Sequence, residues 1–403
     1  MDTPSKLRLL AILMLLGPAV ALGASFPLSP TKTLPVGTAP RGVVVFDHNI
    51  AVVNSGSNSV SVFLGSCTNS SCTYNKAPGS PLNVGLGPTS IAKGHFRGPG
   101  TPWDLVTSNY ADPANTVTVL LGSGAGRFPQ SILMNAGPSP ETVVVGSFKG
   151  DGYDDIAVTN ATGLSPTVSV ILNNRDCSSA SCIPSFAPAV PYTLPHAVLP
   201  WGLATGRFQK PGHIDLVVAN YYSSDYGASG ASVLRNMNDG SGTFYPAVAY
   251  PAGFYSPYVA TGHFNSKTQK LDDFAVTNLG GWIFEFNNDN DQSPQSHDGA
   301  FATTPVASKA VSGFALLAIA TINNGNGSTD DLVVANVSTN QVEVLQSKGG
   351  GLFTFPPAET ITVSPAGLQP VAVLVDDVGV GIQALLVVNE GTNNLMIFVS
   401  PTI

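Results

Sequence analysis

Short apolar segments closed by an asparagine recur along the chain. After a loop, each is followed by a second apolar run rich in β-branched residues, as at residues 59–65, 116–122 and 167–173. Runs this short and this rich in valine are typical of strands. Asparagine suits a strand end because its amide bonds nearby backbone and tolerates a left-handed turn. By subtraction of their positions, the closing residues lie 51 to 60 residues apart: Asn54, Asn109, Asn160, Asn220, Asn278, Asn336 and Asn389. Such a period indicates a propeller or a solenoid.

Each repeat contains two further strand-like segments. A glycine or proline turn and an apolar run precede every asparagine-closed segment, at residues 42–46, 90–96, 141–148, 201–208, 258–264, 315–322 and 371–376. After the β-branched run, hairpin residues lead into segments such as 126–136, 242–251 and 351–363. Four strands per repeat make a propeller blade. The sequence therefore predicts an all-β, seven-bladed β-propeller whose blades are four-stranded and antiparallel.

The two ends of the chain are predicted to close this ring. The last repeat runs out after its third strand, near Val399, while residues 26–34 precede the first repeat without a unit of their own. We predict that residues 26–34 supply the fourth strand of the last blade, which leaves no open edge there. Residues 25–403 are then a single propeller domain, because no linker interrupts the period.

Residues 1–24 have the pattern of a secretory signal peptide. Lys6 and Arg8 precede the apolar run 9–16, and small residues follow it. This run is too short to span a bilayer, and no later run reaches the length of about 18 apolar residues that a membrane helix needs. We expect an exported protein that is secreted, periplasmic or at the cell surface, with no transmembrane segment in the mature chain. An uncleaved anchor is the alternative.

The charge of the chain narrows the range of partners. Charged residues make up 10% of the sequence, and the net charge of −8 becomes about −9 without residues 1–24, which carry one net positive charge. An acidic, weakly charged surface without a basic cluster excludes nucleic acid as a partner. We expect a monomer that binds a glycan or an extracellular protein.

Four cysteines form two pairs with the same spacing, Cys67 with Cys72 and Cys177 with Cys182. Both pairs fall between the third and fourth strands of their repeats, where other repeats have glycine-rich hairpins. We predict a local disulfide in each hairpin, consistent with export. A four-cysteine zinc site is the alternative, which pairs two blades apart with no histidine nearby do not favour.

Residues 146–158 (GSFKGDGYDDIAV) resemble the FG-GAP or VCBS-type repeat, as found in the propeller of integrin alpha subunits and in many exported bacterial proteins. The resemblance extends over all seven repeats. It implies a propeller with the first strand innermost and, in complete family loops, a calcium ion between the first and second strands. At the matching positions it implies Asp151 and Asp155 as carboxylate ligands and the Tyr153 carbonyl as a third. Lys149 departs from the family pattern, and a lysine opposes cation binding.

Other acidic loops are poorer candidates for a cation. In the sixth repeat, the loop before the second strand is rich in side-chain oxygens: Asn323, Asn324, Asn326, Asp330 and Asp331. Residues 287–291 (NNDND) follow the third strand of the fifth repeat, and we interpret them as a solvated hairpin. In the second, fourth and fifth repeats, the aspartate that opens the second strand is expected to bond backbone amides of the preceding turn.

The sequence lacks the local motifs of catalysis. Its six histidines are scattered without metal-ligand spacing, and there is no HExxH, nucleophile elbow or phosphate loop. The first strands, which should line the central channel, are mostly apolar or small and leave few carboxylates for acid–base chemistry. We therefore favour a protein that is not an enzyme. The alternative is a propeller hydrolase or lyase whose catalytic groups gather in the channel from several blades.

Aromatic residues are concentrated in those loops of the fourth and fifth repeats that should share one face. The predicted ligand-binding residues are Trp201, Tyr221, Tyr222, Tyr226, Tyr255 and Tyr258. Flat rings with hydrogen-bonding groups suit sugars or peptides without demanding net charge. The predicted function is an exported recognition or adhesion module that binds glycans or protein partners through this face. The structural alternative is that the rings pack between enlarged loops. Buried rings would indicate this packing role, whereas a contiguous exposed cluster would indicate a binding surface. A scaffold without a ligand is a third possibility.

Overall fold

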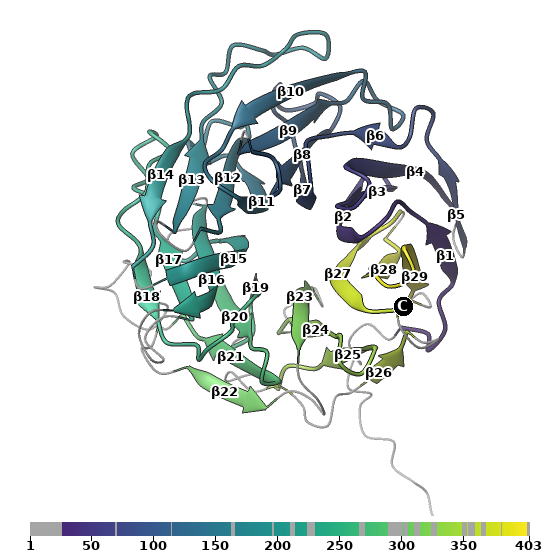
Figure 1. Cartoon of the computed structure of the whole chain (residues 1–403), viewed down its shortest axis with the longest axis vertical. Helices are drawn as coiled ribbons and strands as arrows, with labels where there is room; N and C mark the ends of the chain where they lie inside the picture. Colours follow the sequence, from purple (N-terminus) through teal and green to yellow (C-terminus); the bar gives the residue numbers. More distant parts are fainter. Residues whose placement is uncertain are drawn as a thin grey trace, which may run out of the picture.

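The computed structural model describes residues 26–68, 71–113, 115–162, 166–195, 197–209, 214–223, 230–265, 271–288, 301, 305–309, 315–323, 329–348, 353, 359–363, 368–379 and 381–400. Within these residues, every regular element is a strand. The strands form seven antiparallel sheets that stand around a common axis as the blades of a ring (Figure 1). The predicted seven-bladed β-propeller is therefore confirmed.

Blades 1 to 6 are each built from consecutive strands. Blade 1 contains β2 (Pro40–Phe46), β3 (Asn49–Asn54), β4 (Ser59–Thr68) and β5 (Ser71–Lys76), and the short β6 (Leu82–Asn83) also pairs with β4. Blade 2 contains β7 (Pro88–Gly94), β8 (Asp104–Asn109), β9 (Thr116–Leu121) and β10 (Gln130–Asn135), and blade 3 contains β11 (Pro140–Gly146), β12 (Asp155–Asn160), β13 (Thr167–Ile171) and β14 (Val190–Thr193). Blade 4 contains β15 (Ala197–Gly206), β16 (Asp215–Ser223), β17 (Ala231–Leu234) and β18 (Val248–Tyr250). Blade 5 contains β19 (Val259–Gly262), β20 (Asp273–Thr277), β21 (Trp282–Phe286) and β22 (Val306–Lys309), and blade 6 contains β23 (Leu316–Ile322), β24 (Asp331–Asn336), β25 (Gln341–Leu345) and β26 (Glu359–Thr362).

Blade 7 joins the two ends of the described chain. It contains β27 (Pro370–Asp377), β28 (Gln383–Asn389) and β29 (Asn394–Val399), and its outer strand is β1 (Lys32–Pro35). Thr33 of β1 lies opposite Met396 of β29. The predicted closure is confirmed, although β1 begins later than the start of the predicted segment. Figure 1 shows the first strand of each blade nearest the axis, so the starts of the first strands surround it.

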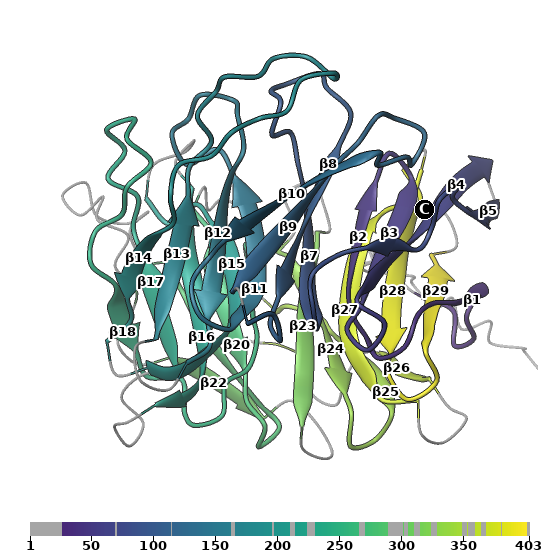
Figure 2. The same ribbon diagram turned by 45° about the horizontal axis from the view of Figure 1, so that its top comes forward.

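The antiparallel order gives the ring two different faces (Figure 2). On one face the first strands begin and the second strands end at or close to the repeated asparagine; we call it the asparagine face. On the other face the second strands begin, mostly with aspartate, and the third strands end; we call it the aspartate face.

The hydrophobic core lies between neighbouring blades. Each of seven clusters of buried apolar side chains combines residues of two adjacent blades, and one joins Val53 of blade 1 to Leu105 of blade 2. Across five blade boundaries, a phenylalanine that ends or follows a first strand packs edge to face against a phenylalanine beyond the third strand of the next blade. Their ring centroids are 5.1 to 5.7 Å apart: Phe46–Phe128, Phe96–Phe186, Phe148–Phe244, Phe208–Phe301 and Phe264–Phe353. Such pairs add to the stabilisation from burial.

The repeated asparagines do not end their strands through left-handed turns. All seven are described, and none has a positive φ. In every blade except blade 5, the amide of this asparagine reaches instead to the third strand. In blade 2, Asn109 Nδ2 donates to the hydroxyls of Thr116 and Thr118, at 3.0 and 2.9 Å. In blade 6, Glu343 replaces the second hydroxyl, and Asn336 Nδ2 donates to its Oε1 at 3.4 Å. The asparagine therefore fastens the second strand to the third.

Candidate functional site

The aromatic residues predicted from the loops of blades 4 and 5 come together on the asparagine face. Trp201 of β15 and Tyr221 of β16 stack with ring centroids 4.2 Å apart and planes 17° from parallel. Tyr255, between β18 and β19, packs edge-on against Tyr221 at 5.6 Å, and Tyr222 lies 6.0 Å from Tyr255. We call Trp201, Tyr221, Tyr222 and Tyr255 the aromatic cluster. Tyr226 lies outside the described residues.

The aromatic cluster reaches solvent. Tyr222 is 41% exposed and Tyr255 is 45% exposed, while Trp201 and Tyr221 are half-buried. Rings that served only to pack loops together would be buried. The cluster is therefore contiguous and combines two half-buried rings with two exposed ones.

The loop that carries Tyr255 is held by the strand-end asparagine of blade 5. Phe284 stands where the third strands of blades 1 to 4 have a hydroxyl, and Asn278 Nδ2 donates to the Phe254 carbonyl instead. The Leu279 N–H donates to the Tyr255 carbonyl at 2.9 Å. Tyr255 has a φ of 57°, a left-handed value that is rare for a bulky residue. The surrounding bonds thus hold Tyr255 in a strained backbone with its ring exposed.

A second set of residues comes from the starts of the first strands, around the axis. In blades 1 to 4 and 7, the strand register shifts directly after a proline. Such a bulge leaves the next residue out of the ladder and re-aims its side chain. The residues that follow these prolines are Arg41, Thr89, Glu141, Trp201 and Val371, and Tyr258 follows Pro257 just ahead of β19.

Four residues near the axis interact electrostatically, although they come from blades 1, 3, 5 and 7. Arg41 Nη2 lies 2.8 Å from Oε1 of Glu390, which follows β28. Burial raises the pKa of the Glu141 carboxyl to about 7, and the charge of Arg41 opposes that shift. Burial, followed by the charge of Glu141, also raises the pKa of Tyr258. We call Arg41, Glu141, Tyr258 and Glu390 the axial cluster.

Only Tyr258 of the axial cluster was expected from the sequence. Arg41 and Glu141 open strands that are otherwise apolar, and Glu390 lies in a turn of blade 7. The sequence did contain a signal, because the residue after the repeated proline varies between charged, aromatic and aliphatic types. The first strands carry few carboxylates, and Glu141 of β11 is one of them.

On the aspartate face, a lysine occupies the position of the predicted calcium ion. Lys149 Nζ lies 3.3 Å from Asp151 Oδ2 and 3.7 Å from Asp155 Oδ1, and it donates to the Asn173 carbonyl. Asp155 also accepts two backbone N–H groups, and burial raises its pKa to about 6. A calcium ion would have to displace the ammonium group, so these residues do not fit the ion with Lys149 in place. Calcium held by Asp151, Asp155 and the Tyr153 carbonyl stays a prediction.

Side chains fill the same position in blades 2 and 4. Arg97 binds both carboxylate oxygens of Asp104, and the side chains are 2% and 0% exposed. Gln209 Nε2 donates to Asp215 Oδ1 at 2.8 Å. The aspartates also accept backbone N–H groups of the preceding turn: Asp104, Asp215 and Asp273. This role, predicted for blades 2, 4 and 5, is confirmed.

Further hydrogen bonds on the aspartate face tie each blade to the one before it. The residue shortly after the third strand donates its side chain to the carbonyl of the preceding blade's phenylalanine. The pairs are Asn173 to Phe96, Asn236 to Phe148, Asn288 to Phe208 and Ser347 to Phe264, at 2.7 to 3.0 Å. We call these four bonds the amide latches, although the last donor is a hydroxyl.

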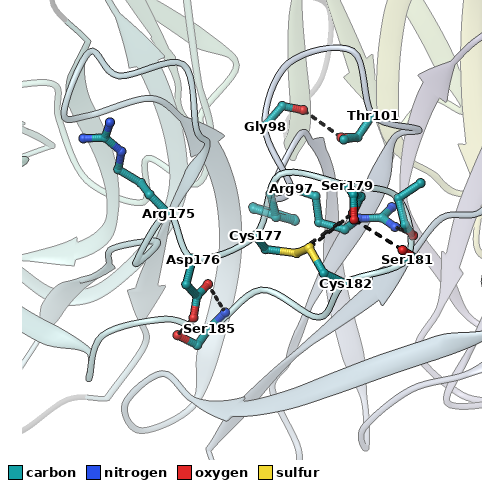
Figure 3. Close-up of a disulfide and its surroundings, with 12 residues drawn as sticks. Arg97, Gly98, Thr101, Arg175, Asp176, Cys177, Ser179, Ser181, Cys182 and Ser185 are labelled. Carbon is teal, nitrogen blue, oxygen red and sulfur yellow. Dashed lines mark hydrogen bonds between the residues drawn. A yellow bond between two sulfur atoms is a disulfide. The ribbon is translucent and has the colours of Figure 1, made fainter.

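Both predicted disulfides are present, Cys67 with Cys72 and Cys177 with Cys182. Each covers the turn between the first two strands of the preceding blade. Arg97 Nη1 donates to the Ala180 carbonyl within the second disulfide loop, which Figure 3 shows beside Arg97. Cysteines joined in this way are not zinc ligands, and disulfides indicate an oxidising environment.

Several predicted features lie outside the described residues: residues 1–24, Asn324, Asn326 and residues 289–291. Among the residues that the structure does describe, no three or more His, Cys, Asp or Glu side chains are arranged to hold a metal ion. In that same part of the chain, no helix has the length and hydrophobicity needed to cross a membrane.

Comparison with solved structures shows the fold class. Hydrazine synthase of Kuenenia stuttgartiensis superposes with a TM-score of 0.58 at 11% identity, over 96% of this chain and 99% of that chain. The Cps50 (Swd1) β-propeller domain of Myceliophteria thermophila gives 0.55 at 10% identity, over 93% and 99%. BBS1N in complex with ARL6DN gives 0.55 at 13% identity, over 94% and 98%.

These identities support the fold alone. No protein-family model and no curated protein matches the chain. The protein is therefore a seven-bladed β-propeller, and membership of the FG-GAP or VCBS-type family stays a prediction from its repeats.

Proposed function

We propose that this protein is an exported, non-catalytic recognition module that binds a carbohydrate on the asparagine face. The aromatic cluster carries the proposal, since its rings are contiguous and Tyr222 and Tyr255 are 41% and 45% exposed. A sugar presents C–H groups on its faces and hydroxyls around its rim, which suits flat rings beside polar side chains. The disulfides and the signal-like residues 1–24 support export.

The fold does not choose between kinds of ligand. Among its structural neighbours, BBS1N was crystallised in complex with ARL6DN, whereas another neighbour is a hydrazine synthase. Binding of a protein partner through the aromatic cluster is accordingly the main competing outcome of the tests below.

A glycan array tests the proposal. The protein would be screened with and without calcium beside the triple variant Trp201→Ala, Tyr222→Ala, Tyr255→Ala. The matched control is Tyr245→Ala, because Tyr245 is 44% exposed but lies beyond the third strand of blade 4, on the aspartate face. Selective binding that the triple variant loses and the control keeps supports the proposal. If the folded protein binds no glycan either with or without calcium, the proposal is overturned and the search turns to protein partners.

A propeller hydrolase or lyase is the second candidate, and Glu141 is the observation that favours it. A carboxyl whose pKa is raised to about 7 suits general acid–base chemistry near neutral pH. The measurement is turnover of any glycan identified on the array. Hydrolysis that Glu141→Gln removes while binding persists would replace recognition by catalysis as the function.

A further inference from the structure

We infer that the axial and aromatic clusters together recognise a glycan that carries protonated amines, an inference that rests on the proposed function. The two clusters adjoin on the asparagine face. Thr159 Oγ1 accepts the Thr142 N–H at 3.0 Å and donates to the Trp201 carbonyl at 2.9 Å, so the backbone beside Glu141 is fixed next to that of Trp201.

The axial cluster holds two carboxylates, Glu141 and Glu390, but only one guanidinium, that of Arg41. Arg41 is matched by Glu390 in a 2.8 Å ion pair. The Glu141 carbonyl accepts hydrogen bonds from Thr89 and Ser108, but its carboxylate makes no hydrogen bond or ion pair within the described part of the chain. With both carboxylates ionised, this cluster therefore carries one net negative charge.

A carboxylate that interacts with Tyr258, on the same face as the aromatic cluster, suits an ammonium group. The carboxylate supplies a charge-assisted hydrogen bond, and the faces of tryptophan and tyrosine attract cations through their quadrupoles. The net charge of −8 draws cations toward the protein as a whole. N-acetylation of the same sugar removes its positive charge and with it these interactions. The site should therefore distinguish free-amine sugars from N-acetylated ones.

The matched probes are a glucosamine tetramer with free amines and its fully N-acetylated counterpart, titrated calorimetrically at low ionic strength. We expect the free-amine tetramer to bind at least tenfold more tightly, and Glu141→Gln to remove that preference without lowering the melting temperature. The control is Asp239→Asn, which also removes one negative charge but lies in an exposed turn beyond the third strand of blade 4; it should keep the preference.

A trimethylated tetramer separates titration of the protein from titration of the sugar, because its charge does not change with pH. Its affinity should fall as the pH drops from 8 to 6, since Glu141 then takes up a proton, and Glu141→Gln should show no such fall. Both results support the inference.

Three outcomes would overturn it. Equal binding of free-amine and acetylated tetramers leaves glycan recognition standing but removes the amine preference. An unchanged preference in Glu141→Gln removes the assigned site. Binding of a lysine-rich peptide but of none of the sugars shows that the ligand is a protein, and the proposed function then fails as well.

Discussion

The two faces of the ring use the same repeat in opposite ways. On the aspartate face, equivalent positions do equivalent work: an aspartate accepts backbone amides, an amide latch reaches the preceding blade, and a phenylalanine packs across the boundary. On the asparagine face, the position after the repeated proline differs from blade to blade, as Arg41, Glu141 and Trp201 illustrate. The positions that repeat from blade to blade make the interactions that assemble the ring, and the positions that differ lie on the face to which we assign ligand binding.

The sharpest test of this difference replaces one arginine on each face by alanine and compares the effects on stability. Arg97→Ala leaves Asp104 buried without its partner and should lower the free energy of unfolding by about 3–5 kcal/mol. Arg41→Ala breaks an ion pair whose side chains are 42% and 25% exposed and should cost at most about 1 kcal/mol. Urea unfolding of both variants is the measurement. Equal costs would mean that the two faces contribute alike to assembly.

Removing one amide latch should cost less stability than removing Arg97. Asn236→Ala leaves the carbonyls of Phe148 and Ile214 without their donor and should lower the free energy of unfolding by about 2 kcal/mol. Asn174→Ala is the control, because Asn174 also follows a third strand on this face but is exposed and bonds only locally to Ser185. A cost for Asn236→Ala no larger than for the control would show that the latch does not join the blades.

Glu343 makes the asparagine face of blade 6 sensitive to pH. Burial raises its pKa from 4.5 to about 7, so the folded state keeps a proton that the unfolded chain releases. This contribution to stability is complete below pH 4.5 and is lost as the pH rises through 7. Glu343→Gln should flatten this part of the curve by about 1–2 kcal/mol. Parallel curves for the two proteins, measured by urea unfolding from pH 4 to 8, would contradict the assignment.

The smallest expected effect concerns calcium. Lys149→Asn removes the ammonium group between Asp151 and Asp155 and supplies an oxygen in its place. Calcium should then raise the melting temperature of the variant more than that of the wild-type protein, by roughly 1–2 °C. Lys348→Asn serves as the control, since Lys348 is exposed in blade 6. An equal change in melting temperature with calcium in all three proteins would show that this loop does not bind calcium.

The strands, their closure into a ring and the clustering of neighbouring loops were predictable from the sequence, whereas side-chain pairs between distant blades were not. The period of the asparagines and the run-out near Val399 predicted the blades and their closure, because strand patterns are local. The aromatic cluster was predictable because blades 4 and 5 are neighbours along the chain. Arg41 and Glu390 are 349 residues apart, and only closure of the ring brings them together.

Sequence reasoning also treated Lys149 only as an obstacle to a cation. It did not foresee that Arg97 and Lys149 would themselves take the cation's place, because that depends on the path of each side chain through its turn. The short strand β6 was not predicted, because two residues are too few to show a strand pattern.

The pairing of β1 with β29 sets the order of events during folding. Strand β1 precedes the other described strands, yet its partner β29 is made more than three hundred residues later, and joining segments this far apart costs roughly 5 kcal/mol of chain entropy. Until blade 7 is complete, the apolar residues of blade 1 that pack against it stay uncovered. Blade 7 can therefore be completed only after β29 has been made, and the ring stays open until then.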